Sequence, residues 1–145
     1  MMEKLVRKWS KKFGLTVRDE FTNIKWEEKL NAAKLIDEEY IELTTALSED
    51  DNPNIVEEAV DLIWVTIRLL QIMGVDAEEA LKIKFDANMT KGFENIKEVT
   101  EEAISKDCVV ANPSRGFYVM KNRTTGKVVK PDHYKKPDFK TNYPN

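Results

Sequence analysis

Four acidic residues stand in two pairs with the same internal spacing. Glu39 and Glu42 are three residues apart, and after a gap of 15 residues Glu58 and Asp61 repeat that spacing. Residues three apart share one face of a helix, so each pair would present two carboxylates in one direction. Like charges at this spacing repel each other, and they are costly to bury without a partner. Hard divalent cations such as Mg²⁺ prefer oxygen ligands and often bring a phosphate substrate with them.

The sequence alone leaves other interpretations of these acids open. Glu38 and Glu42 fit a solvated stripe of charge, and Asp61 could pair with Arg68, which follows seven residues later on the same helical face. Glu39, however, falls inside the apolar arc of its helix, and Asp61 falls within a segment that is apolar nearly all the way round. Such a segment predicts a buried helix. The combination favours a metal site formed by the four carboxylates.

Two consecutive helices must position these pairs. Apolar residues recur at helical spacing over 26–47 without a breaker, and 48–53 is a polar loop that ends in proline. Asn54, followed by Glu57 three residues later, predicts the cap of a further helix that runs to Met73. The short loop makes the two helices antiparallel neighbours, which would bring both acidic pairs together.

Two further helices and a different C-terminal segment complete the predicted organisation. The helices span about 2–13 and, after a cap at Asp76, a stretch that reaches Lys91. We therefore expect an all-α fold with a four-helix core in residues 1–107, and a C-terminal extension in residues 108–145. The extension is irregular and can contain a β-hairpin. Its β-prone stretches are 109–110, 117–120 and 127–130, with a turn at 125–126 between the last two.

The net charge of −3 hides an acidic body and a basic tail. Residues 1–112 hold 15 Lys/Arg against 24 Asp/Glu, and residues 113–145 hold 8 against 2. A protein that binds duplex DNA is more often basic throughout, so nucleic acid is an unlikely partner. With one cysteine, one histidine and no long apolar run, the sequence lacks the patterns of a disulfide framework, a zinc site and a membrane span. We expect a cytoplasmic, soluble protein.

The two acidic pairs resemble the ExxE…ExxD pattern of the all-α nucleoside triphosphate pyrophosphohydrolases. That group includes MazG-like proteins, phosphoribosyl-ATP pyrophosphohydrolases and dimeric dUTPases. The similarity covers about residues 30–91 and includes Lys84, Asn88 and Lys91 in the helix that follows the second pair. The first helix and the tail, with its stretches 126–130 and 134–137, are similar to MazG-like proteins.

This resemblance implies an activity and a role for each site residue. The reaction would be Mg²⁺-dependent hydrolysis of a (d)NTP to (d)NMP and pyrophosphate, with Mn²⁺ as a substitute, in nucleotide-pool housekeeping. The protein would be a homodimer or homotetramer. The resemblance makes metal ligands of the four paired carboxylates. It gives Glu38 the role of an acid behind these ligands or of a candidate base. Lys84, Asn88 and Lys91 would contact phosphates or sugar.

Several alternatives accompany this hypothesis. Lys127 and Lys130 of the tail, with Lys121, either border a triphosphate entrance or keep an exposed segment soluble. Lys84 and Lys91 could be ordinary surface lysines. A non-catalytic helical oligomer that binds nucleotide or metal is the main alternative function, and a nucleic-acid binder acting through the tail is another. The preferred base is not determined by the sequence; the three tryptophans could stack on it or belong to the core: Trp9, Trp26 and Trp64.

Overall fold

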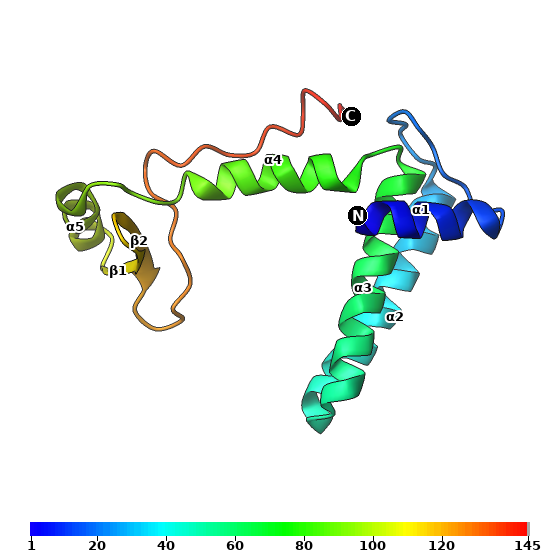
Figure 1. The fold of residues 1–145 in the computed structure, drawn as a ribbon, viewed down its shortest axis with the longest axis horizontal. Helices are drawn as coiled ribbons and strands as arrows, with labels where there is room; N and C mark the ends of the chain where they lie inside the picture. Colours follow the sequence, from blue (N-terminus) through cyan, green and yellow to red (C-terminus); the bar gives the residue numbers. More distant parts are fainter. Residues whose placement is uncertain (145) are drawn as a thin grey trace. The chain divides into compact units, whose positions relative to one another are not determined.

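The protein is mainly helical and ends in a small β-hairpin, as the sequence predicts. The computed structural model describes residues 1–144, in which five helices precede two strands (Figure 1). None of these helices combines the length and the apolarity needed to cross a membrane. The elements are α1 (Met2–Lys12), α2 (Trp26–Glu49), α3 (Asn52–Ile72), α4 (Ala77–Met89), α5 (Ile96–Ser105), β1 (Cys108–Ser114) and β2 (Phe117–Asn122). The chain divides into two compact units, residues 1–80 and residues 81–144.

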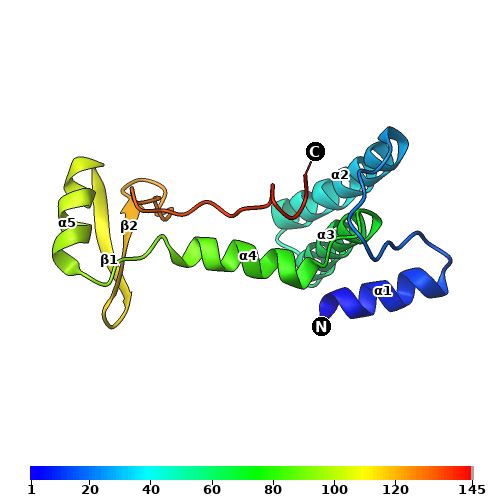
Figure 2. The same ribbon diagram turned by 90° about the horizontal axis from the view of Figure 1, so that it is seen from above.

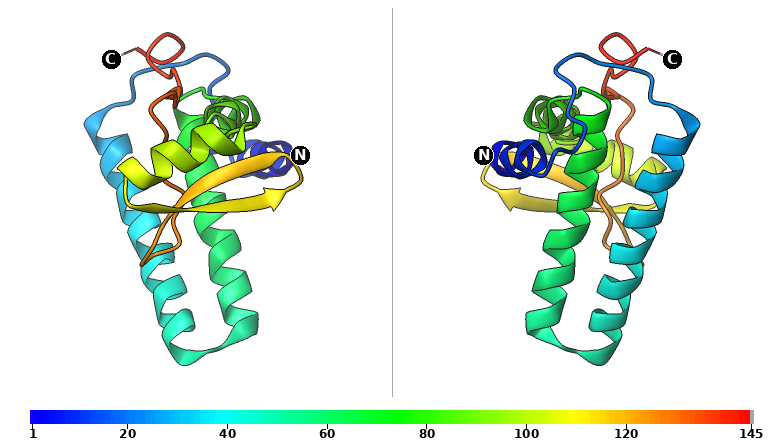
Figure 3. Two further views of the ribbon diagram at one scale, coloured as in Figure 1. Left: turned by 90° about the vertical axis from the view of Figure 1, so that its left-hand side faces the viewer. Right: turned by 90° about the vertical axis from the view of Figure 1, so that its right-hand side faces the viewer.

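The first unit is built around the antiparallel pair α2 and α3, which lie side by side in both views of Figure 3. The buried residues of α2 are alanines, Ala32 and Ala46, whose small side chains let the helices approach closely. Asp50 adopts a left-handed conformation that ends α2. The carboxylate of Asp51 then accepts a hydrogen bond from the Asn54 backbone at the start of α3. The cap is therefore Asp51 rather than the predicted Asn54, because α3 begins three residues earlier than predicted.

Helix α1 packs across α3 (Figure 1). Buried polar side chains lie at this contact. Gln71 is fully buried, and its side-chain Nε2 donates to the backbone oxygen of Glu3 at 3.1 Å. Ser10 is also fully buried, and its hydroxyl donates to the Val6 carbonyl at 2.7 Å. Because these buried polar groups are all partnered, they fix the position of α1 on α3 without an unsatisfied donor.

The segment between α1 and α2 crosses the carboxyl end of α3. The Arg18 amide donates to the Gln71 carbonyl at 3.0 Å, and the Thr22 amide donates to the Met73 carbonyl at 2.9 Å. Gly74 ends α3 with a φ of +70°, and a Cβ there would lie 1.9 Å from the Glu20 carbonyl oxygen. The crossing segment thus satisfies carbonyls that a helix end leaves unpaired, and only glycine fits beneath it.

The expectation that α3 is buried on all sides is wrong for this chain. Val56, Val60 and Ile63 on α3 are 64 %, 51 % and 45 % exposed. Within residues 1–80 the helices that pack on α3 are α1 and α2, and two neighbours cannot cover the whole circumference of a helix. An apolar pocket of about 140 Å³ on this face is lined by residues of α1 and α3: Met2, Leu5, Val6, Val60, Ile63, Trp64 and Ile67.

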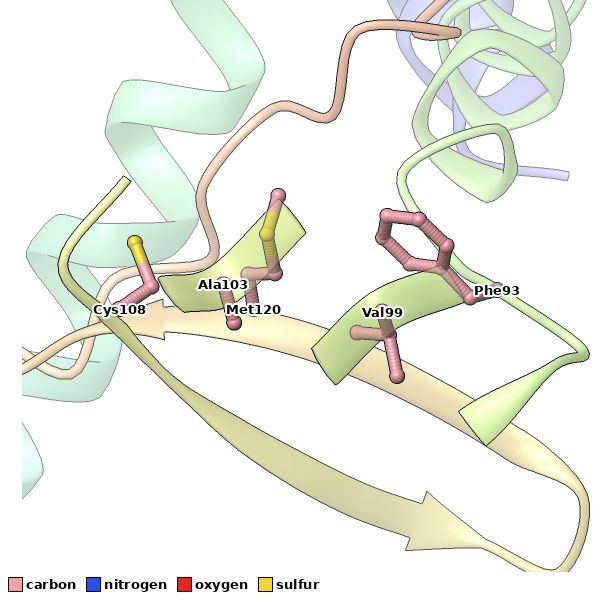
Figure 4. Packing of buried hydrophobic residues seen from close by; sticks show 5 residues of the cluster. All are labelled: Phe93, Val99, Ala103, Cys108 and Met120. Atoms are coloured by element: carbon pink, nitrogen blue, oxygen red, sulfur yellow. The ribbon is translucent and has the colours of Figure 1, made fainter. Parts of the chain in front are cut away.

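The second unit has its own core, formed where α5 packs along the hairpin (Figure 2). Figure 4 shows the buried side chains of this cluster, which are Phe93, Val99, Ala103, Cys108 and Met120. The sequence analysis did not predict α5, which is capped by the Asn95 side chain. β1 and β2 pair antiparallel with Val110 opposite Met120. The predicted turn at 125–126 is present, since the Gly126 amide donates to the Asn122 carbonyl at 3.0 Å.

Candidate metal centre

Three of the predicted acidic residues meet between α2 and α3. Glu39 projects from the middle of α2, and Glu58 and Asp61 project from the first half of α3, one turn apart. One carboxylate oxygen from each lies within 4.8 Å of the other two. Because the helices are antiparallel and joined by a short loop, the two i, i+3 pairs face each other across the helix interface. The convergence therefore follows from the spacing of the two motifs.

A fourth acid, Glu42, takes part in the same electrostatic environment. Partial burial raises the pKa of Glu39, and the charges of Asp61, Glu42 and Glu38 raise it further. Partial burial also raises the pKa of Glu58, followed by the charge of Glu42. Glu42 thus acts on acids of both helices, whereas Glu38 acts on Glu39 from the solvent-exposed side of α2.

In the described part of the chain, residues 1–144, these acids have no basic partner. None of the ion pairs among residues 1–144 involves Glu38 or any of the four paired carboxylates. The alternative partner for Asp61 is engaged elsewhere: Nη1 of Arg68 donates to the Ser10 hydroxyl at 2.9 Å and to the Thr16 carbonyl at 3.2 Å. Burial lowers the pKa of the Arg68 guanidinium. The ion pair between Asp61 and Arg68 is therefore not formed.

The donor set fits a hard divalent cation. All the converging atoms are carboxylate oxygens, which Mg²⁺, Mn²⁺ and Ca²⁺ accept as ligands, and no thiol or imidazole is present among them. Two of the acids, Glu39 and Glu58, are half-buried, so their charges are less screened than those of a solvated stripe. Burial and mutual repulsion both raise the pKa of these two acids. A bound cation would offset the repulsion, and it could at the same time hold phosphate oxygens.

The predicted phosphate ligands lie in the second unit. Lys84 and Asn88 are exposed on α4, and Lys127 is exposed in the turn after β2. Lys91 and Lys130 meet at the ring of Tyr134, with their Nζ atoms 5.7 Å and 5.1 Å from its centroid. This grouping was not foreseen, because it depends on how the tail folds back past the end of α4.

A pocket that sequence reasoning missed lies one helical turn from the acids. On α2 its wall includes Leu35, four residues before Glu39, and on α3 it includes Val65, four residues after Asp61. The pocket measures about 310 Å³ and is mostly apolar. Its lining comes from α2, α3 and the segment that follows α1: Leu15, Thr16, Glu28, Asn31, Ala32, Leu35, Val65, Arg68, Leu69 and Ile72.

The three tryptophans do not share one role. Trp9 packs edge-on against Trp64 with ring centroids 5.5 Å apart, at the contact between α1 and α3. Trp26, at the start of α2, is 71 % exposed. None of the three lines the pocket beside the acids.

Comparison with known proteins agrees with the pattern of acids. Residues 6–88 match the family model of phosphoribosyl-ATP pyrophosphohydrolase, which is more than half of the chain. The matched span contains all four paired carboxylates together with Lys84 and Asn88, and it excludes the hairpin and the tail. A search of curated proteins finds no match.

Proposed function

Since the chain belongs to the phosphoribosyl-ATP pyrophosphohydrolase family, we propose that it is a Mg²⁺-dependent pyrophosphohydrolase of nucleoside triphosphates. The family implies pyrophosphohydrolase activity on a nucleotide. The finer assignment is cleavage of a (d)NTP to (d)NMP and pyrophosphate, as nucleotide-pool housekeeping in the cytoplasm. The observation that carries it is the convergence of Glu39, Glu58 and Asp61 from two helices. Within residues 1–144 none of the three forms an ion pair with a basic side chain.

In this proposal each acid has a defined role. Glu39, Glu42, Glu58 and Asp61 hold the metal, for which their carboxylates are suitable ligands. When bound, Mg²⁺ or Mn²⁺ would supply positive charge that offsets the charge of the phosphates and makes a nearby water more acidic. The oxygen of water forms a bond to the α-phosphorus, and the bond from that phosphorus to the bridging oxygen breaks. Glu38 is the candidate base for the proton that the water loses.

The phosphate chain needs positive charge as well as the metal. We assign Lys84, Asn88 and Lys91 to contacts with phosphates or sugar, and Lys127 and Lys130 to the entrance of the triphosphate site. Charge on the phosphate oxygens grows in the transition state, so ammonium groups near them lower the barrier. In this assignment residues 1–107 form the pyrophosphohydrolase domain, and residues 108–145 form a basic C-terminal extension that contributes to binding.

We also propose that the protein is a homodimer or homotetramer. The support is the uncovered apolar face of α3, where Val56, Val60 and Ile63 are about half exposed. A helix that is apolar nearly all round needs a partner on each side, and a second copy would supply it. Sedimentation equilibrium should therefore give an assembly of two or four chains. A charged substitution, Val60→Lys, should shift it toward the monomer, and a monomer for the unmodified chain would contradict the proposal.

The activity is tested by a pyrophosphate-release screen. Canonical and modified nucleoside triphosphates are incubated with Mg²⁺ or Mn²⁺, and the unmodified chain is compared with Asp61→Asn. The matched control is Asp37→Asn, which removes an exposed carboxylate of α2 outside the cluster. We expect release from at least one triphosphate, its loss in Asp61→Asn, and its retention in the control. Metal-dependent nucleotide binding without turnover would instead identify a non-catalytic oligomer.

A further inference from the structure

The half-buried guanidinium of Arg68 lines the pocket beside the acids with most of its donors unused. Its hydrogen bonds within residues 1–144 all leave from Nη1, toward Ser10, Thr16 and Gln71. In the same part of the chain every buried side-chain nitrogen or oxygen has a partner. The Nε and Nη2 atoms therefore border accessible space, and they carry three N–H groups.

The pocket has the position expected of a nucleoside site. Arg68 follows Asp61 by seven residues on the same face of α3, which corresponds to about 10 Å along the helix axis. A nucleotide whose phosphates lie at the acids would thus extend its base along α3 toward Arg68. Leu35 and Val65 provide apolar walls between these two points, and the pocket volume of about 310 Å³ accommodates a purine.

We propose that this pocket binds the base of the substrate and that Arg68 selects a 6-oxopurine, guanine or hypoxanthine, over a 6-aminopurine. A guanidinium offers only donors, in a fixed fork. The O6 and N7 atoms of a 6-oxopurine are two adjacent acceptors that match this fork. Adenine presents an amino donor in place of O6, so a donor would face a donor and one hydrogen bond would be lost. The inference rests on the proposed function, because the acids fix where the phosphates lie.

The selection is measured by binding, apart from turnover. Isothermal titration calorimetry of the full-length protein with guanosine 5′-monophosphate and adenosine 5′-monophosphate, with and without Mg²⁺, gives the ratio of their dissociation constants. A bidentate contact of this kind discriminates by about fivefold to about 150-fold. We therefore expect guanosine 5′-monophosphate to bind about tenfold more tightly. Equal affinities for the two nucleotides would overturn the inference.

Substitution of Arg68 distinguishes recognition of the base from a purely structural role of this residue. A glutamine side chain pairs a donating NH₂ group with an accepting carbonyl oxygen, which matches the N6 and N7 atoms of adenine. Arg68→Gln should therefore remove the preference for guanine and increase the relative affinity for adenine. A folded Arg68→Gln protein that keeps the full guanine preference would refute the role of Arg68.

Pocket filling tests the location without changing Arg68. Leu35 lines the pocket and is 47 % exposed, so Leu35→Trp can be accommodated and should block the site for both nucleotides. Leu30→Trp, at an exposed position of α2 outside the lining, is the matched control. Unchanged binding in Leu35→Trp would overturn the assignment.

If the protein selects the base as expected but hydrolyses no triphosphate, the proposed function is wrong and the pocket assignment is retained. If the protein hydrolyses a triphosphate but does not select the base, the pocket assignment is wrong and the proposed function is retained.

Discussion

Substitution of one acid in the cluster should stabilise the metal-free protein while it abolishes activity. Glu39 is half-buried, and burial together with the charges of Asp61, Glu42 and Glu38 raises its pKa. Glu39→Gln keeps the shape of the side chain and removes its charge. Without a metal the acids therefore repel less, and the free energy of unfolding should rise.

The size of this effect follows from the spacing of the carboxylates. The ligand oxygens of the cluster all lie within 4.8 Å of one another, and two unit charges at that distance repel by about 0.9 kcal/mol in bulk water. Because the site is partly exposed, solvent screening keeps the repulsion near that value. Glu39 has two such neighbours, so the gain is about 1–2 kcal/mol at pH 7. This corresponds to a rise in Tm of about 3–6 °C for a chain of this size.

Thermal unfolding followed by circular dichroism measures this gain. In EDTA, Glu39→Gln should melt above the unmodified chain, whereas Asp37→Asn, on the same helix but outside the cluster, should match it. If Mg²⁺ binds with a Kd near 1 mM, a concentration of 10 mM adds about 1.4 kcal/mol to the unmodified chain. Glu39→Gln should gain less. A variant that melts at or below the unmodified chain in EDTA would refute the electrostatic reasoning.

The same raised pKa values give a dependence on pH. The folded state holds the protons of Glu39 and Glu58 more tightly than the unfolded chain does. The metal-free protein therefore loses stability as the pH rises from the usual glutamate value of about 4.5 through the raised pKa. The loss should be smaller in Glu39→Gln. Because metal must displace these protons, Mg²⁺ affinity should rise over the same interval.

Three further substitutions test the packing inside each of the two units. Gly74→Ala puts a Cβ 1.9 Å from the Glu20 carbonyl oxygen at a φ of +70°, and chemical denaturation should show a loss of more than about 2 kcal/mol. Gly92→Ala puts a Cβ 2.1 Å from the ring of Phe117, so hydrogen exchange should accelerate in the hairpin. Met120 is fully buried, so Met120→Ala should lower the free energy of unfolding by about 2–5 kcal/mol. An unchanged free energy of unfolding would contradict a packed core in the second unit.

The convergence of the acids could be predicted from the sequence because every step was local. The i, i+3 spacing sets a helical face, a short polar loop makes the helices antiparallel, and caps set their ends. Asp76, for example, accepts hydrogen bonds from the Glu78 and Glu79 amides as its position predicts. The loop residue that caps α3 was misassigned because Asp51 and Asn54 are both good caps and only the structure shows where α3 begins.

The features that the sequence did not predict depend on contacts between distant segments. The pocket exists because Leu15 and Thr16, which follow α1, lie beside α2 and α3. Periodicity on one helix carries no information about such a wall. The open face of α3 was missed for a similar reason, since an apolar circumference shows only that a helix needs neighbours. It does not show whether the same chain supplies them.

The most direct test of the central claim is the position of cleavage. The protein is incubated in ¹⁸O-labelled water with Mg²⁺ and the triphosphate that the screen identifies, and the products are analysed by mass spectrometry. Attack of water on the α-phosphorus predicts one ¹⁸O in the nucleoside monophosphate and none in the pyrophosphate, with no product from Asp61→Asn. Label in the pyrophosphate, release of a diphosphate and orthophosphate, or unchanged turnover by Asp61→Asn would contradict it.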